Sequence, residues 1–161
     1  MESPRVVFII PAYNEEITVA KVINSISKFG SSIVIDDASY DKTAEVAKTN
    51  GAIVITHSKN LGYDKSLNTG FKIADKMGFK FAITLDADQQ HDTKAVPKLL
   101  SELFNKEVDI VAGVRVNSQR FSEYIFKVIS KYVWGLKDPL CGLKGYRMDI
   151  YKKFGTFDTF N

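Results

Sequence analysis

Residues 6–37 read VVFIIPAYNEEITVAKVINSISKFGSSIVIDD, and this stretch indicates the fold. The apolar runs at 6–10 and 33–35 are typical of strands that are buried on both faces. Between them, apolar residues recur at spacings of three and four, which is the pattern of a helix with one buried face. These residues are Val19, Val22, Ile23, Ile26 and Phe29. A strand, a helix and a second strand in this order predict a parallel α/β unit.

The alternation of strands and helices continues along the chain. Further strands are predicted at 53–55, 81–85 and 108–112, and further helices at 43–50, 66–77, 96–104 and 122–134. Residues 142–145 are expected to form a turn or a short strand. We therefore expect a single α/β domain over residues 1–161, with a mostly parallel central sheet. Ligands of such sheets bind beyond the carboxyl ends of the strands, so the residues that follow each strand are the candidates for a site.

Composition and charge exclude several classes of protein. The 161 residues include 22 Lys and Arg against 19 Asp and Glu, a net charge of +3 that does not indicate nucleic-acid binding. The single cysteine, Cys141, cannot form an internal disulfide, which favours a reducing compartment. The longest stretch without a charged residue, 49–58, is far shorter than the ~20 apolar residues of a membrane-spanning helix. We expect a cytoplasmic protein without a signal peptide.

Two carboxylates follow the predicted strand at 81–85. Asp86 and Asp88 are two residues apart, so both side chains can reach one hard cation such as Mg²⁺ together with phosphate oxygens of a substrate. Asp is also common in turns after strands, and this structural interpretation stays open.

A second acidic pair, Asp36 and Asp37, follows the strand at 33–35. Adjacent like charges are unfavourable unless a ligand donor, a cation or backbone N–H groups compensate them. A nucleobase N–H or a ribose hydroxyl would be a suitable donor. Asp41 is expected to cap the next helix, and His57 is expected at the surface.

Five short motifs occur in a fixed order. They are Pro11-Ala12-Tyr13-Asn14-Glu15-Glu16, Asp36-Asp37-Ala38-Ser39-x-Asp41-x-Thr43, Asn60-x-Gly62 with Gly70-Phe71, Asp86-Ala87-Asp88-x-Gln90-His91 and Asp138-Pro139-x-x-Gly142. Together they resemble the family-2 glycosyltransferases of the GT-A fold. The chain is most similar to the branch that contains dolichol-phosphate mannosyltransferases and other polyprenyl-phosphate glycosyltransferases.

The resemblance implies a Rossmann-like three-layer α/β sandwich and an inverting, metal-dependent glycosyltransferase. Such an enzyme moves a sugar from a nucleotide diphosphate to a polyprenyl (dolichyl) phosphate or another acceptor in glycan or glycolipid synthesis. The residues implied for nucleotide-sugar binding are Pro11, Ala12, Tyr13, Glu15, Ile35, Asp37, Asp86, Ala87, Asp88 and Arg115. Those implied for an Mg or Mn ion are Asp86, Asp88 and Gln90.

The resemblance also implies two catalytic residues. Arg115 faces the phosphates of the donor or the acceptor, where its planar guanidinium suits phosphate oxygens. Asp138 is near the acceptor: it acts as a general base if the acceptor is a hydroxyl, and it orients groups if the acceptor is a phosphate anion. Asp138-Pro139 is also a common turn, so a structural role stays open.

The sequence departs from the family on its acceptor side. Where the branch has a second arginine, only Lys127 or Lys131 is available, and the chain ends at Asn161 where family members continue. These departures motivate an alternative to an enzyme. The chain would then be a non-catalytic module, with a trimmed acceptor half, that binds a sugar nucleotide or serves in assembly. An incomplete acceptor side would leave apolar surface for a second copy, so a homodimer is expected, with at most peripheral contact with the inner membrane face.

Other nucleotide-binding classes lack their sequence signatures here. No G-x-G-x-x-G follows the first strand and no phosphate-binding G-x-x-x-x-G-K-[ST] motif occurs, which argues against a dehydrogenase and excludes a P-loop NTPase. A sugar-nucleotide pyrophosphorylase would need a loop rich in Gly and Arg after the first strand, where this chain has Pro11-Ala12-Tyr13-Asn14.

Overall fold

The computed structural model describes residues 5–88, 93–105, 107–113 and 141–156. The predicted helix at 122–134 lies outside the described residues. So do three of the candidate site residues, Gln90, Arg115 and Asp138.

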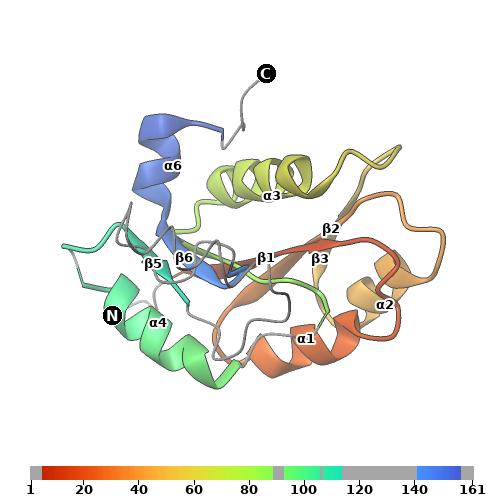
Figure 1. Cartoon of the computed structure of the whole chain (residues 1–161), viewed down its shortest axis with the longest axis horizontal. Helices are drawn as coiled ribbons and strands as arrows, with labels where there is room; N and C mark the ends of the chain where they lie inside the picture. Colours follow the sequence, from red (N-terminus) through yellow and green to blue (C-terminus); the bar gives the residue numbers. More distant parts are fainter. Residues whose placement is uncertain (1–4, 89–92, 106, 114–140, 157–161) are drawn as a thin grey trace, which may run out of the picture.

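The centre of the molecule is a six-stranded sheet in the order β3-β2-β1-β4-β6-β5 (Figure 1). Its strands are β1 (Val6–Ala12), β2 (Ser31–Asp36), β3 (Ile53–Thr56), β4 (Phe81–Thr84), β5 (Ile110–Ala112) and β6 (Lys144–Arg147). The first four strands pair in parallel, and β6 is antiparallel to both β4 and β5. The predicted mostly parallel sheet is therefore confirmed, with one antiparallel strand inserted in it.

Helices cover both faces of the sheet and make three layers (Figure 1). They are α1 (Val19–Ile26), α2 (Thr43–Thr49), α3 (Tyr63–Lys76), α4 (Val96–Leu103) and α6 (Met148–Phe154), with a short 3-10 helix, η1 (Thr93–Ala95), before α4. Phe8 and Ile10 of β1 pack in one core with α1 and α4, whereas Val7 and Ile9 pack in a second core with α3 and α6. Alternate residues of β1 thus serve opposite cores, which explains its continuous apolar sequence.

The structure differs from the predicted elements in a few places. β1 continues through Pro11 to Ala12, beyond the predicted end at residue 10. The pairing of β1 with β4 stops at Ile9, so Pro11 pairs only with β2. Because proline has no backbone N–H, it is tolerated here, where no hydrogen bond to β4 is needed. Helix α3 starts at Tyr63, three residues earlier than predicted, and α6 was not predicted.

None of the helices in the described part of the chain is long and apolar enough to span a bilayer.

Gly70 gives a stability test of the packing between α3 and β1. A Cβ at this position would lie 2.2 Å from Cγ2 of Ile9, so the helix approaches the strand more closely than any larger residue allows. We predict that Gly70→Ala lowers the free energy of unfolding in urea by about 1–3 kcal/mol through overpacking. Helix propensity alone would give the opposite sign, a gain of about 1 kcal/mol. A more stable variant would therefore contradict this packing.

Candidate functional site

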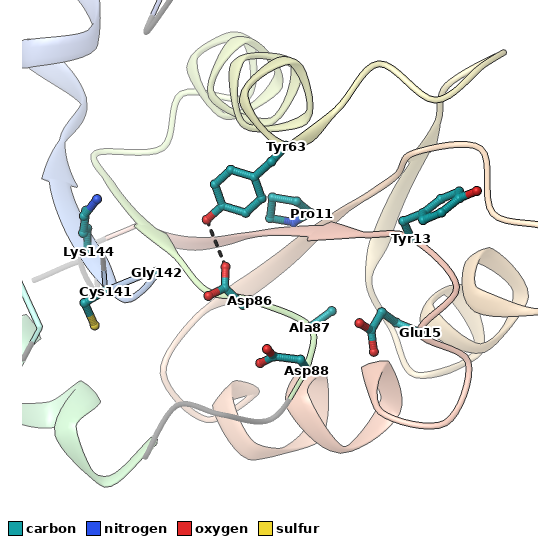
Figure 2. A pocket seen from close by; sticks show the side chains of 10 residues that line it. All are labelled: Pro11, Tyr13, Glu15, Tyr63, Asp86, Ala87, Asp88, Cys141, Gly142 and Lys144. Atoms are coloured by element: carbon teal, nitrogen blue, oxygen red, sulfur yellow. Dashed lines mark hydrogen bonds between the residues drawn. The ribbon is translucent and has the colours of Figure 1, made fainter. Parts of the chain in front are cut away.

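The loops at the carboxyl ends of β1, β2 and β4 enclose two adjoining pockets. The wide pocket has a volume of about 510 Å³ and is lined by Pro11, Tyr13, Glu15, Tyr63, Asp86, Ala87, Asp88, Cys141, Gly142 and Lys144 (Figure 2). The narrow pocket has a volume of about 260 Å³ and is lined by Pro11, Ala12, Tyr13, Asp37, Asn60, Gly62, Tyr63 and Ser66. Because Pro11, Tyr13 and Tyr63 line both, the pockets form one elongated cavity with two parts.

The structure brings eight predicted site residues to the walls of these pockets. They are Pro11, Ala12, Tyr13, Glu15, Asp37, Asp86, Ala87 and Asp88. Ile35 is not among them, although the resemblance implied that it lines the nucleotide pocket. Its position in β2 directs its side chain into the core beside α3, where it is fully buried. Ile35 is therefore a core residue and lines neither pocket.

Asp86 lies between two elements that are far apart in the sequence. The Tyr63 hydroxyl at the start of α3 donates a hydrogen bond of 2.9 Å to Oδ1 of Asp86 (Figure 2). On another side, a Cβ placed on Gly142 would lie 2.0 Å from Oδ2 of Asp86, so this carboxylate packs directly against the glycine backbone. Although Tyr63 is 47% exposed as a whole, desolvation of its hydroxyl and the adjacent Asp86 carboxylate raise the pKa of Tyr63 above its usual value of 10.0. The phenol thus remains a hydrogen-bond donor at neutral pH.

The wide pocket combines acidic side chains with a cation. Figure 2 shows Glu15, Asp86 and Asp88 directing carboxylates toward the same cavity, and Lys144 of β6 lies on its other side. Among the residues that the structure describes, no three His, Cys, Asp or Glu side chains form a metal-binding cluster. Asp86 and Asp88 nevertheless suit Mg²⁺ or Mn²⁺, because such ions are commonly held by one or two carboxylates with the remaining ligands from substrate phosphates and water. This site fits an ion that binds together with a phosphorylated ligand.

In the narrow pocket, the Asp37 carboxylate accepts three hydrogen bonds from the protein. Oδ1 accepts from Nδ1 of His57 (2.7 Å) and from the backbone N–H of Leu61 (2.9 Å), and Oδ2 accepts from the N–H of Gly62 (2.7 Å). Burial opposes ionisation, but these hydrogen bonds outweigh it and hold the pKa of Asp37 below its usual 3.8. Backbone N–H groups, one of the compensating groups expected for the adjacent charges of Asp36 and Asp37, therefore do bind the Asp37 carboxylate.

The expectation for His57 was wrong. Its side chain is only 9% exposed, because it lies between Asp37 and Thr69, whose Oγ1 is 3.0 Å from Nε2. A lone histidine in a loop carries no sequence signal for such a buried contact.

Hydrogen bonds between two loops hold Tyr13 and Glu15 at the pocket wall. The N–H of Asn14 donates to Oγ of Ser39 (2.9 Å), and the N–H of Glu15 donates to Oγ1 of Thr43 (2.7 Å). Asp41 accepts from the N–H of Thr43 (2.9 Å), the first residue of α2, and from the N–H of Glu16 (3.1 Å). The N-cap position of α2 is Lys42, so Asp41 precedes the cap that we expected it to form. Asn14 has a φ of 58°, a left-handed conformation that Asn tolerates better than most residues.

Several residues of the site were not predicted from the sequence. Tyr63 lies directly after the Asn60-Leu61-Gly62 turn, a helix-start signal that would have placed it at the sheet edge. Lys144 gave no such signal, because its short strand has too few residues for a periodic pattern. Ser66, also in the narrow pocket, has a fully buried Oγ with no hydrogen-bond partner among the described residues.

Comparisons with known proteins agree with this geometry. The sequence model of the family described as Glycosyl transferase family 2 matches residues 7–156. An uncharacterized protein of Methanocaldococcus jannaschii is 37% identical over 159 residues, covering 90% of this chain and 65% of the relative. A UDP-N-acetylglucosamine–dolichyl-phosphate N-acetylglucosaminyltransferase of Methanococcus voltae is 30% identical over 139 residues, covering 74% of this chain and 55% of the relative.

A solved structure shows the same fold. The crystal structure of glucosyl-3-phosphoglycerate synthase from Mycobacterium tuberculosis, in complex with Mn²⁺, UDP-glucose and phosphoglyceric acid, superimposes with a TM-score of 0.74 at 22% identity. The match covers 92% of this chain and 58% of that chain. The expected GT-A arrangement of a Rossmann-like three-layer sandwich is thus confirmed.

The hydrogen bonds of Asp37 predict a pH-dependent contribution to stability. Asp37→Asn would place an amide N–H₂ against backbone and imidazole N–H donors, so we predict a loss of about 1–3 kcal/mol in the free energy of unfolding at pH 7. Because the folded-state pKa of Asp37 lies below 3.8, its stabilising effect is present above that pH and is lost as pH falls through the folded-state value. Urea denaturation of both proteins at a series of pH values should show the difference closing below about pH 4. A difference that stays constant or widens in acid would contradict this role.

Proposed function

Because this chain belongs to glycosyltransferase family 2, we propose that it binds a nucleotide-diphosphate sugar and transfers the sugar with inversion, in a reaction that depends on a divalent cation. The observation that carries the proposal is that Asp86, Asp88 and Lys144 line one wide pocket, which adjoins a narrow pocket through Pro11, Tyr13 and Tyr63. We further propose that residues 1–161 act as one domain, of which the family match covers 7–156.

The two parts of the cavity suit the two ends of the donor. The narrow pocket has an aromatic wall in Tyr13 and polar groups in Asn60 and Ser66, which suits a nucleobase and its ribose. In Asp37, Oδ2 accepts only one of the three hydrogen bonds, so it retains capacity for a ligand N–H or O–H. The wide pocket then receives the diphosphate and the sugar.

The charges of the wide pocket suit a leaving diphosphate. Asp86 and Asp88, with Gln90 as the further expected ligand, would hold Mg²⁺ or Mn²⁺ on the diphosphate oxygens. When bound, the ion neutralises the negative charge that develops on the leaving group. Lys144 of β6 adds a positive charge to that of the ion, and its ammonium group can donate hydrogen bonds to phosphate oxygens.

Transfer with inversion is a single displacement. An acceptor oxygen forms a bond to the anomeric carbon on the face opposite the diphosphate, and the bond to the diphosphate oxygen breaks with its electron pair. A polyprenyl phosphate is already an anion and needs no general base. A hydroxyl acceptor would need one, and Asp138 is our candidate for that role, with Arg115 as the residue that contacts phosphate oxygens.

The activity for which one relative is named supports a lipid acceptor. The Methanococcus voltae enzyme acts on dolichyl phosphate, and we propose a polyprenyl phosphate for this chain on that basis. The chain spans 65% and 55% of the two relatives described above. The alternative to transfer is a module that binds the sugar nucleotide without transferring the sugar. The two hypotheses differ in turnover, and both require the donor site.

Calorimetric titration tests the donor site. We predict that one of GDP, UDP, dTDP and CDP binds tightly with Mn²⁺ and at least ~10-fold more weakly in EDTA, because the diphosphate binds between the ion and Lys144. Turnover of the matching sugar nucleotide with a polyprenyl phosphate would then support transfer over the binding module. Folded protein that binds none of the four nucleotides would contradict the proposal.

Asp88 gives a direct test of the cation site. Asp88→Asn preserves the shape of the side chain but removes its charge, so we predict at least a ~10-fold loss of nucleotide affinity with Mn²⁺ and little change in EDTA. The matched control is Asp149→Asn on α6, because the Asp149 side chain is 72% exposed and lines neither pocket. If Asp88→Asn binds nucleotide like the wild type in Mn²⁺, the assigned role of Asp88 is wrong.

Lys144 gives a test that does not depend on the cation. Removing its charge with Lys144→Met should weaken nucleoside diphosphate binding both with Mn²⁺ and in EDTA, while a nucleoside that lacks phosphates is unaffected. Calorimetry with the diphosphate and the nucleoside separates these effects. An equal loss for both ligands would place Lys144 near the base instead of the phosphates.

A further inference from the structure

A continuous set of contacts connects the narrow pocket to Asp86 in the wide pocket. It starts at the Asp37 carboxylate, which accepts hydrogen bonds from the backbone N–H groups of Leu61 and Gly62. Gly62 precedes α3 with a φ of 90°, a conformation that L residues with side chains rarely adopt. Asp37 therefore fixes the turn from which α3 begins.

The first residue of α3 is Tyr63, and its side chain is directed by this turn. Its ring lies between the two pockets, and its hydroxyl reaches Oδ1 of Asp86 at 2.9 Å (Figure 2). A hydrogen bond to one oxygen of a carboxylate restricts rotation of the whole group about its χ2 torsion, which is otherwise broad. Tyr63 thus holds the Asp86 carboxylate in one orientation.

Gly142 restricts the same carboxylate from another direction. The loop before β6 is fixed by a hydrogen bond of 2.7 Å from Oγ1 of Thr84 to the carbonyl oxygen of Gly142. A Cβ on Gly142 would occupy the space of both oxygens of Asp86, at 2.0 and 2.6 Å. The position of the carboxylate therefore leaves no room for a side chain at residue 142.

We propose that Tyr63 is a positioning residue that orients Asp86 for the divalent cation. This inference rests on the proposed function, because it takes Asp86 as a ligand of the ion on the donor diphosphate. Carboxylates that bind metal are usually hydrogen-bonded by a second group, and removing that group typically weakens metal binding 10–100-fold. Tyr63 supplies this group from the element that Asp37 anchors in the narrow pocket.

Tyr63→Phe tests the proposal, because it keeps the ring between the pockets and removes only the hydroxyl. Calorimetric titrations with GDP, UDP, dTDP and CDP are compared in Mn²⁺ and in EDTA. For the nucleotide that binds, we expect affinity in Mn²⁺ to fall about 10-fold and affinity in EDTA to change less than 2-fold. The concentration of Mn²⁺ that gives half-maximal binding should rise by a similar factor, so all affinities in Mn²⁺ are compared at one concentration below saturation. Saturating Mn²⁺ should restore affinity.

Two further variants accompany this experiment. Gly142→Ala displaces the Asp86 carboxylate from its other side and should give the same Mn²⁺-specific loss. Tyr151→Phe on α6 is the matched control: Tyr151 stacks on Phe71 at 5.5 Å between ring centroids and lines neither pocket, so affinity should not change.

The outcomes separate this inference from the proposed function. Wild-type-like binding by Tyr63→Phe in Mn²⁺ would overturn the positioning role and leave the donor site intact. An equal loss in Mn²⁺ and in EDTA would overturn it too, because the hydroxyl would then contact the nucleotide itself. A wild-type protein that binds none of the four nucleotides would overturn the proposed function and this inference with it.

Discussion

The pairing of β1 with both β2 and β4 is the constraint on which the site depends. In this register Ala12 lies opposite Asp36, and Ile9 lies opposite Thr84. The loops that follow these strands must therefore emerge at one edge of the sheet, although they begin after residues 12, 36 and 84. β1 can occupy this central position because its residues are apolar toward both cores.

The acidic residues at this edge have different tasks. Asp37 is ionised and engaged by N–H donors of the protein, so its charge stabilises the turn before α3. Asp86 and Asp88 lie in the wall of the wide pocket. Asp86 accepts a hydrogen bond from the Tyr63 hydroxyl. Because the phenol is neutral, this contact orients the Asp86 carboxylate and leaves its negative charge in place. An acidic residue after a buried strand thus stabilises a turn in the case of Asp37, whereas we propose that Asp86 and Asp88 bind a cation.

The sequence predicted the sheet well, because continuous apolar strands and helices with one buried face leave distinct periodic patterns. It also predicted that residues around Pro11, Asp37 and Asp86 would meet, since parallel strands present their carboxyl ends together. It did not predict that Ile35 points into the core or that His57 is enclosed, because both depend on side-chain direction after folding. Lys144 was inaccessible to this reasoning, since β6 is short and pairs antiparallel with strands far away in sequence. Gly142 belonged to a recognised motif, but its contact with Asp86 was not predicted.

The central claim is that a nucleoside diphosphate and a divalent cation bind together at Asp86 and Asp88. Crystals grown with Mn²⁺ and the preferred nucleotide would test it through the anomalous scattering of manganese. We predict one strong anomalous peak within coordination distance of an Asp86 or Asp88 oxygen and of the diphosphate, with the base in the narrow pocket. A nucleotide bound at this edge with no manganese beside either carboxylate, or with manganese elsewhere, would contradict the account.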